Sequence, residues 1–255
     1  MRHVISAILC LWAIASFAQI EDTALVCVVY KAKYVEYEGQ AQKEECDQVL
    51  NIGQHYSKYF CGQKSATQRE ALSYLTKCST GHRKFTIYKN YPQEGKLIYT
   101  EFVGSNKFKY EEEMEIIDWQ LLEGDSTVAG YRCNKATGTL HGNKWTAWYT
   151  LDIPYSDGPW KLSGLPGLIM AASDASGLFT YECIEISTST NPPLKVNVNL
   201  FQQCTPKELQ EQRTLYWKDQ ANYVAQSAGI PHLDMNKATG DMSQKSLKAV
   251  FEEEY

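Results

Sequence analysis

Cys133 is the side chain whose neighbours most directly suggest chemistry. It lies two residues from Lys135 in a β-rich run, and a nearby ammonium group lowers the pKa of a thiol, which raises the fraction of reactive thiolate. Catalysis would also need a base that a third group holds in place. His141 stands eight residues further on, on the order of 25 Å away along a strand at ~3.3 Å per residue. We therefore expect a disulfide or a buried thiol at Cys133, with a thiol-dependent enzyme as the alternative.

The sequence lacks other familiar catalytic patterns. Lys161 stands two residues before Ser163, where the G-x-S-x-G turn of hydrolases requires glycine. The acidic run from Glu111 to Glu113 has no spacing that distinguishes catalysis from a solvated strand edge. No two cysteines follow a C-x-x-C spacing and the five histidines stand apart. The sequence therefore predicts no metal site and no cofactor.

One predicted strand carries an aromatic side chain among polar neighbours. Gly142-Asn143 predicts a two-residue hairpin with a type II′ turn, which would pair Lys135 with Thr150. In this register Cys133 and Trp148 share the polar face, because successive side chains alternate between faces. An aromatic ring on such a face is typical of a ligand-binding surface, unless a helix or loop covers it. The predicted binding residues are Lys135, Trp148, Asp152, Trp160 and Lys161.

A glycine- and proline-rich segment follows this hairpin, and its residue types determine the conformation of the backbone. Leu165-Pro166-Gly167-Leu168 predicts a type II turn, with proline at the second position and glycine at the third. In such a turn Gly167 must adopt a positive φ, which strains any other residue. The predicted structural turn residues are Gly164, Pro166 and Gly167.

The elements that position these residues are short and β-rich. Between Leu25 and about Phe201, runs of Tyr, Val, Ile and Thr are broken by Gly, Asn, Asp and Ser, which predicts an antiparallel β protein. Apolar residues change from even to odd positions at Ile116-Ile117, which predicts a bulge that bends the sheet. We expect a mainly β fold, a curved antiparallel sheet or half-open β-barrel. The candidate strands cover residues 25–35, 57–61, 84–88, 96–102, 107–116, 118–122, 131–139, 144–153, 168–172, 178–186 and 195–200.

Two segments predict helices instead. Gln68 to Lys77 has helical spacing behind a capping threonine. Thr205-Pro206-Lys207-Glu208 forms a capping box and predicts a helix to about Ser227 that covers the sheet. The expected organisation is an antiparallel β domain over 19–204, a helical segment over 205–234 and a poorly ordered acidic tail over 235–255.

Residues 1–18 predict a cleaved secretory signal. They combine a basic start, an apolar run from Val4 to Ile14 and a small-residue ending, and this run is shorter than the roughly 20 residues of a membrane span. Without them 24 basic and 30 acidic residues remain, a formal charge of −6, which argues against binding nucleic acid or an anionic membrane. Export predicts disulfides, and because seven cysteines remain after residue 18, at least one thiol stays outside any pairing within the chain. The candidate cysteines are Cys27, Cys46, Cys61, Cys78, Cys133, Cys183 and Cys204.

Four short motifs stand in order along the chain: Ala129 to Cys133, Ala147 to Thr150, Gly158 to Lys161 and the six residues Gly164 to Ile169. This ordered set resembles the GLPGLI family of Gram-negative envelope proteins. The resemblance implies a periplasmic or outer-membrane-associated protein without established activity, with a proposed link to TonB-dependent uptake. The family pattern reads Phe-Arg-Gly-Arg where this chain has residues 140–143, so two cations are missing here. The strand order is also similar to that of half-barrel envelope carriers.

These observations favour an exported periplasmic binding or accessory protein that is not an enzyme. Its expected partner is an outer-membrane or periplasmic protein, or a small apolar or peptide ligand, and its oligomeric state stays open. One alternative is a half-barrel carrier or chaperone for apolar or protein clients. The other alternative is a thiol-dependent enzyme that uses Cys133.

Overall fold

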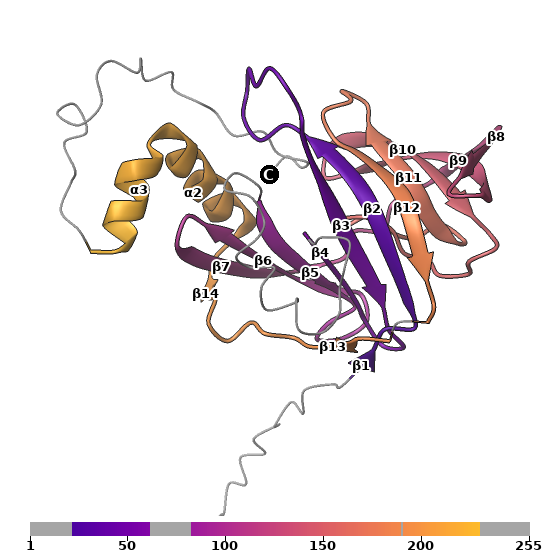
Figure 1. Ribbon diagram of the computed structural model, residues 1–255, viewed down its shortest axis with the longest axis horizontal. Helices are drawn as coiled ribbons and strands as arrows, with labels where there is room; N and C mark the ends of the chain where they lie inside the picture. The colour runs from indigo at the N-terminus through magenta and orange to yellow at the C-terminus, as the bar shows by residue number, and fades with distance from the viewer. Residues whose placement is uncertain (1–21, 62–82, 190, 230–255) are drawn as a thin grey trace, which may run out of the picture.

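A computed structural model describes residues 22–61, 83–189 and 191–229 (Figure 1). The predicted signal, the helix over 68–77, Cys78 and the tail over 235–255 lie outside the described residues. In chain order the strands are β1 (Asp22–Thr23), β2 (Val26–Tyr34), β3 (Glu44–Ile52), β4 (Ser57–Cys61), β5 (Lys84–Lys89), β6 (Lys96–Val103), β7 (Asn106–Glu113), β8 (Gln120–Val128), β9 (Tyr131–Leu140), β10 (Asn143–Thr150), β11 (Leu168–Asp174), β12 (Thr180–Ser187), β13 (Pro193–Leu194) and β14 (Gln202–Gln203).

Twelve of these strands form one sheet, in the order β14-β7-β6-β5-β4-β3-β2-β12-β11-β10-β9-β8, and β1 pairs with β13. Every pairing in the large sheet is antiparallel except that of β14 with β7. The sheet bends strongly without closing, so β5 to β7 lie on one side and β8 to β10 on the other (Figure 1). The predicted mainly β fold with a curved, unclosed sheet is confirmed.

Two strand predictions are wrong. Residues 195–200 form no strand, and the change of phase at Ile116-Ile117 lies in the loop between β7 and β8. Register shifts occur instead at Leu122/Asp125, Trp148/Tyr149 and Cys183/Glu185. An extra residue in one strand bends the ladder locally, and all three shifts involve strands between β8 and β12.

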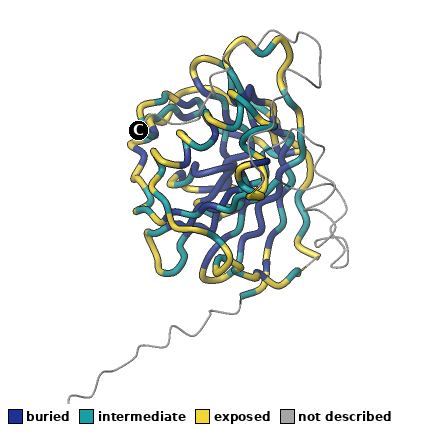
Figure 2. The backbone as a smooth tube through the Cα atoms, turned by 90° about the vertical axis from the view of Figure 1, so that its left-hand side faces the viewer, coloured by how far each residue is buried: buried dark blue, intermediate teal, exposed yellow. Residues whose placement is uncertain are grey.

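A row of aromatic rings lines the inner face of the sheet between β2 and β7. The ring centroids of Tyr30 and Tyr59 lie 6.3 Å apart, and those of Tyr59 and Phe85 lie 6.0 Å apart. Phe85 stacks on Tyr99 at 5.7 Å, and Tyr99 stacks on Tyr110 at 5.0 Å. We call these five residues the aromatic ladder. All are buried, and Figure 2 shows how the buried residues gather along the strands at the centre of the molecule.

The predicted C-terminal helix is present and divided in two. Thr205 and Glu208 form the capping box at the start of α2 (Pro206–Lys218), as expected. Asp219 ends α2 and caps α3 (Gln220–Ser227), because its carboxylate accepts a hydrogen bond from the Asn222 backbone N–H at 3.1 Å. Helix α2 lies on the side of the sheet that β6 and β7 form (Figure 1).

Candidate functional site

The β9–β10 hairpin places Lys135 opposite Trp148. The two central turn residues are His141 and Gly142, with φ of 45° and 81°, as a type I′ turn requires. The predicted turn at Gly142-Asn143 and the pairing of Lys135 with Thr150 are therefore wrong, since Lys135 pairs with Trp148. The true register differs by two residues, and a shift of two returns each side chain to the same face. Lys135 and Trp148 consequently share a face, as predicted.

Both side chains of this pair are half-buried on the outer face of the sheet. Lys135 Nζ lies 5.6 Å from the centroid of the Trp148 ring, within the range of a cation–π contact. A Cβ on Gly124 would meet Trp148 Cη2 at 3.7 Å, so the indole reaches across β9 to the register shift in β8. The ring is thus held by its own sheet and still presents part of its surface to solvent.

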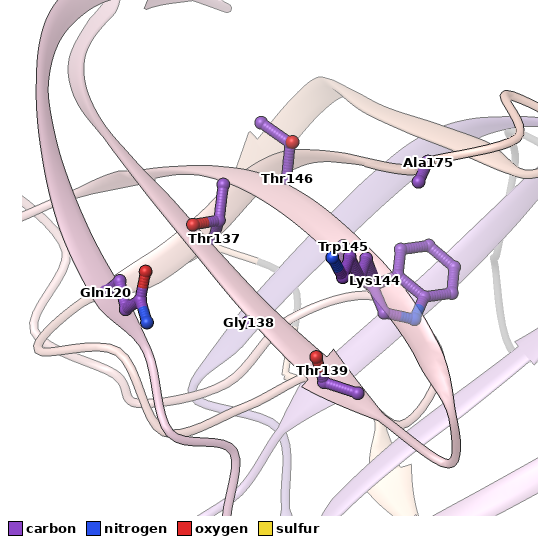
Figure 3. Close-up of a pocket in the computed structure, with 8 residues that line it drawn as sticks. All are labelled: Gln120, Thr137, Gly138, Thr139, Lys144, Trp145, Thr146 and Ala175. Carbon is purple, nitrogen blue, oxygen red and sulfur yellow. The ribbon is translucent and has the colours of Figure 1, made fainter.

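A pocket of about 370 Å³ is lined by residues of β8, β9 and β10 and by Ala175 (Figure 3). Thr137 and Thr146 are cross-strand partners two residues along from Lys135 and Trp148, and their side chains line the pocket. Its lining offers hydroxyl, amide and ammonium groups and contains no carboxylate, which suits a polar neutral or anionic group of a ligand. The lining residues are Gln120, Thr137, Gly138, Thr139, Lys144, Trp145, Thr146 and Ala175.

Cys133 does not share this face. It is fully buried in the core, and Ala136, three residues later, is also buried. Strict alternation would put these two residues on opposite faces, so β9 changes which of its positions point inward. The change lies opposite the register shift between Leu122 and Asp125, which the sequence pattern did not reveal. Burial raises the pKa of the Cys133 thiol, which disfavours the reactive thiolate. Asp152 is exposed beyond the end of β10, where its backbone N–H donates to Thr150 Oγ1 at 3.3 Å.

Trp160 and Lys161 lie inside the molecule, so their prediction as part of a binding surface is wrong. Trp160 is 1% exposed and Lys161 is 4% exposed. Lys161 Nζ lies 2.6 Å from Glu112 Oε1 and 5.1 Å from the centroid of the Tyr110 ring. The segment between β10 and β11 has no strand periodicity, so alternation could not predict which way these side chains point.

The same segment is anchored by a buried ion pair. Lys89 Nζ donates to Asp157 Oδ1, and to the carbonyl oxygen of Gly158 at 2.7 Å. Burial lowers the pKa of Lys89, and the neighbouring Asp157 carboxylate opposes this effect. Lys89 was not singled out from the sequence as a buried residue. Its spacing from Phe85 and Ile87 on β5 was the available signal, because alternate residues of a strand point to the same face.

A second buried cluster joins α2 to the sheet. Arg213 Nε donates to Glu101 Oε1 at 3.0 Å. Arg213 and Arg83 also donate to the Tyr99 hydroxyl, at 3.0 and 3.1 Å. Burial raises the pKa of Glu101, but the two arginines outweigh it and the pKa is lowered overall. Near this cluster, burial raises the pKa of Glu36 to about 8, although Arg83 opposes the shift.

The predicted type II turn at Gly167 is wrong. Gly167 does not take a positive φ, whereas Gly164 has a φ of 92° and Trp160 one of 52°. The need for glycine at 167 is spatial, because a Cβ there would lie 2.0 Å from the carbonyl oxygen of Thr150. Pro166 is exposed and Gly167 is buried beside the end of β10.

The described cysteines differ in their surroundings. Cys133, Cys183 and Cys204 are thiols in the structure, and burial raises the pKa of Cys183 to about 12 and that of Cys204 to about 11. Cys46 Sγ and Cys61 Sγ lie 3.9 Å apart. The disulfide framework stays a prediction. Among the described residues, no three His, Cys, Asp or Glu side chains are grouped so that they could hold a metal ion.

Comparisons with known proteins tell more about the fold of this chain than about its activity. A family model described as a protein of unknown function (Porph_ging) matches residues 140–171, the segment from the hairpin turn into β11. No curated protein matches the chain. The matched stretch is short and includes Gly164 to Ile169, and the GLPGLI resemblance stays a prediction.

Solved structures of PNGF-II in two crystal forms are similar to this chain in fold. Both superpose with a TM-score of 0.50, at 12% and 13% identity, and the match covers 75% of this chain. The chain spans about a third of the length of PNGF-II, since the matches cover 32% and 33% of those chains. In the described part of the chain, no helix is long and apolar enough to cross a membrane.

Proposed function

We propose that this chain is an exported, non-enzymatic binding or accessory protein that holds its partner on the outer face of β8 to β10. The single observation that carries the proposal is the Lys135–Trp148 pair beside a pocket of hydrogen-bonding groups. Binding surfaces combine aromatic contact area with polar groups that orient the partner. We call Gln120, Lys135, Thr137, Thr146 and Trp148 the binding face.

The close ring packing among the described residues of the inner face favours this proposal over a carrier of apolar clients. A carrier would need an apolar cavity inside the curved sheet. The aromatic ladder instead packs ring against ring at 5.0 to 6.3 Å, and Lys161 Nζ lies over the rings of Tyr99 and Tyr110.

The buried titratable groups also favour binding over catalysis. Cys133, the residue of the thiol-enzyme alternative, is fully buried with a raised pKa, whereas a reactive cysteine needs access and a lowered pKa. Glu101 is engaged by arginine side chains, and Lys89 by Asp157. Both groups are buried and engaged in ion pairs within the fold.

The proposal includes a cellular location. The secretory pattern over 1–18 and the envelope-protein resemblance support a periplasmic location, with association at the outer membrane. A link to a TonB-dependent uptake system follows from the resemblance alone. The partner is a periplasmic or outer-membrane protein, or a peptide that such a protein presents.

Cross-linking in the native envelope followed by capture of the chain tests the proposal. Trp148→Ala and Lys135→Ala should reduce the yield of a discrete cross-linked partner several-fold while the chain stays folded. Trp217→Ala is the matched control, since Trp217 is a half-buried tryptophan on α2 whose ring lies 5.2 Å from that of Tyr37. Equal losses in all three variants, or no loss in any, would contradict a binding role for this face.

A further inference from the structure

Two cysteines on neighbouring strands bring their sulfur atoms close together. Cys46 lies on β3 and Cys61 is the last residue of β4. The register pairs Cys61 with Gln48, so Cys46 is its diagonal neighbour. Cys46 Sγ and Cys61 Sγ are 3.9 Å apart, a separation that a disulfide shortens to about 2.05 Å.

Their surroundings hold both sulfurs on the inner face of the sheet. Gln48 Nε2 donates to Cys46 Sγ at 3.4 Å, and the Cys46 thiol donates to the Tyr34 hydroxyl at 3.8 Å. After burial, which is the largest cause, Coulombic interactions with Cys46 and Cys61 also raise the pKa of Tyr34. The 3.8 Å contact of Cys46 with Tyr34 and the 3.9 Å separation of the two Sγ atoms place both sulfurs in one small region near the Tyr34 hydroxyl.

We propose that Cys46 and Cys61 form a disulfide in the exported protein, which ties β3 to the end of β4. One thiolate attacks a disulfide donor such as oxidised glutathione, and the second thiolate then displaces the donor from the mixed disulfide. Each cysteine loses a proton, one S–S bond forms, and the donor takes up two electrons and two protons as it becomes two thiols. The inference is independent of the binding face.

The position of Cys61 makes the bond attainable. Diagonal neighbours in an antiparallel pair lie about 7–8 Å apart at Cα, somewhat more than the ~4.4–6.8 Å of most disulfides. The end of β4 therefore has to move towards β3. Residues 57–60 are paired with β5, whereas Cys61 lies beyond that ladder, so the terminal residue can shift without breaking a pairing with β5.

Non-reducing tryptic mapping of the exported full-length chain, alkylated during lysis, tests the bond. Cys46 lies in the peptide over 44–58, Cys61 in that over 59–64 and Cys78 in that over 78–83. The expected result is a reducible species that joins 44–58 to 59–64. Recovery of both peptides alkylated, or of either one joined to 78–83, would overturn the proposal.

Serine variants separate the bond from an effect on folding. Cys46→Ser should leave Cys61 alkylated, and Cys61→Ser should leave Cys46 alkylated. Reduction should lower the melting temperature of the parent chain and of Cys204→Ser by more than that of Cys46→Ser. Cys204 is the control because its Sγ lies 3.4 Å from the carbonyl oxygen of Lys109, next to β14. An equal response of all these chains to reduction would contradict the assigned pair.

Discussion

A lysine beside a tryptophan is buried on the inner face of the sheet and partly exposed on its outer face. Inside, Trp160 and Lys161 are almost fully buried, and Lys161 Nζ has Glu112 and three aromatic rings around it. Outside, Trp148 and Lys135 contact each other and both keep part of their surface exposed. We therefore expect the buried pair to contribute to folding stability, and the half-exposed pair to be available to a partner.

Trp160→Ala should show the largest difference between the two faces. Removing a fully buried tryptophan leaves a cavity and costs about 3–5 kcal/mol of unfolding free energy, whereas Trp148→Ala should cost about 1 kcal/mol, because its ring is half-exposed. Urea denaturation of both variants measures the difference. Similar losses would show that Trp148 belongs to the core.

Gly167→Ala should be nearly as damaging as the loss of Trp160. The added Cβ meets the Thr150 carbonyl oxygen at 2.0 Å, so the backbone must move, at a cost of about 3 kcal/mol. Gly130→Ala is the comparison, because nothing lies within 4 Å of its Cβ and only its φ of 86° is strained, a cost of about 1–2 kcal/mol. Melting temperatures that fall equally would refute the steric explanation.

Lys161→Met tests whether the inner cation acts through its charge. Methionine is similar to lysine in length and can pack among the same aromatic rings, but it leaves the partly buried Glu112 carboxylate without Lys161, which should cost about 2 kcal/mol. The double variant with Glu112→Gln should regain part of that stability. A double variant less stable than Lys161→Met alone would contradict the charge argument.

The buried Glu36 carboxyl predicts that the stability of the fold depends on pH. Its folded-state pKa of about 8 is higher than the ~4.3 of an unfolded glutamate, so the folded chain holds the proton more tightly. This contribution to stability is complete below the unfolded pKa and is lost as pH rises towards 8. Arg83, Glu44 and Glu101 also act on this carboxyl.

Urea midpoints at pH 5 and pH 8 measure this contribution. Stability should fall by at least about 1 kcal/mol over that interval in the parent chain, and the fall should be smaller in Glu36→Gln. The same slope in both chains would assign the effect to another group.

The smallest expected effect is the coupling between Lys135 and Trp148. A double-mutant cycle with Lys135→Ala and Trp148→Ala should give about 0.5–1 kcal/mol, as for exposed cation–π pairs. A coupling of zero would mean that the two side chains act separately on the outer face.

The sequence predicted the sheet and its outer face better than the inner clusters. Alternation alone placed Lys135 and Trp148 together, because a register error of two residues preserves the face. It missed β3, whose inward positions include polar side chains such as Gln48 and whose first residues are acidic. The α2 capping box was readable because its residues are adjacent in the sequence.

The inner clusters depend on contacts between residues far apart in the chain. Glu101 and Arg213 are 112 positions apart, and Lys89 and Asp157 are 68 apart. Trp160 and Lys161 turn inward within a segment that has no periodicity. Gly167 is needed because Thr150 approaches it, which only the folded backbone reveals.

Site-specific photo-cross-linking tests the binding face most directly. A photoreactive phenylalanine derivative replaces Lys144, an exposed residue of the pocket, or Leu215, which is 51% exposed on α2. After irradiation in the native envelope, the account predicts a discrete adduct from position 144 that Trp148→Ala weakens, and none of that mass from position 215. An adduct from position 215 alone, or equal adducts from both positions, would contradict it.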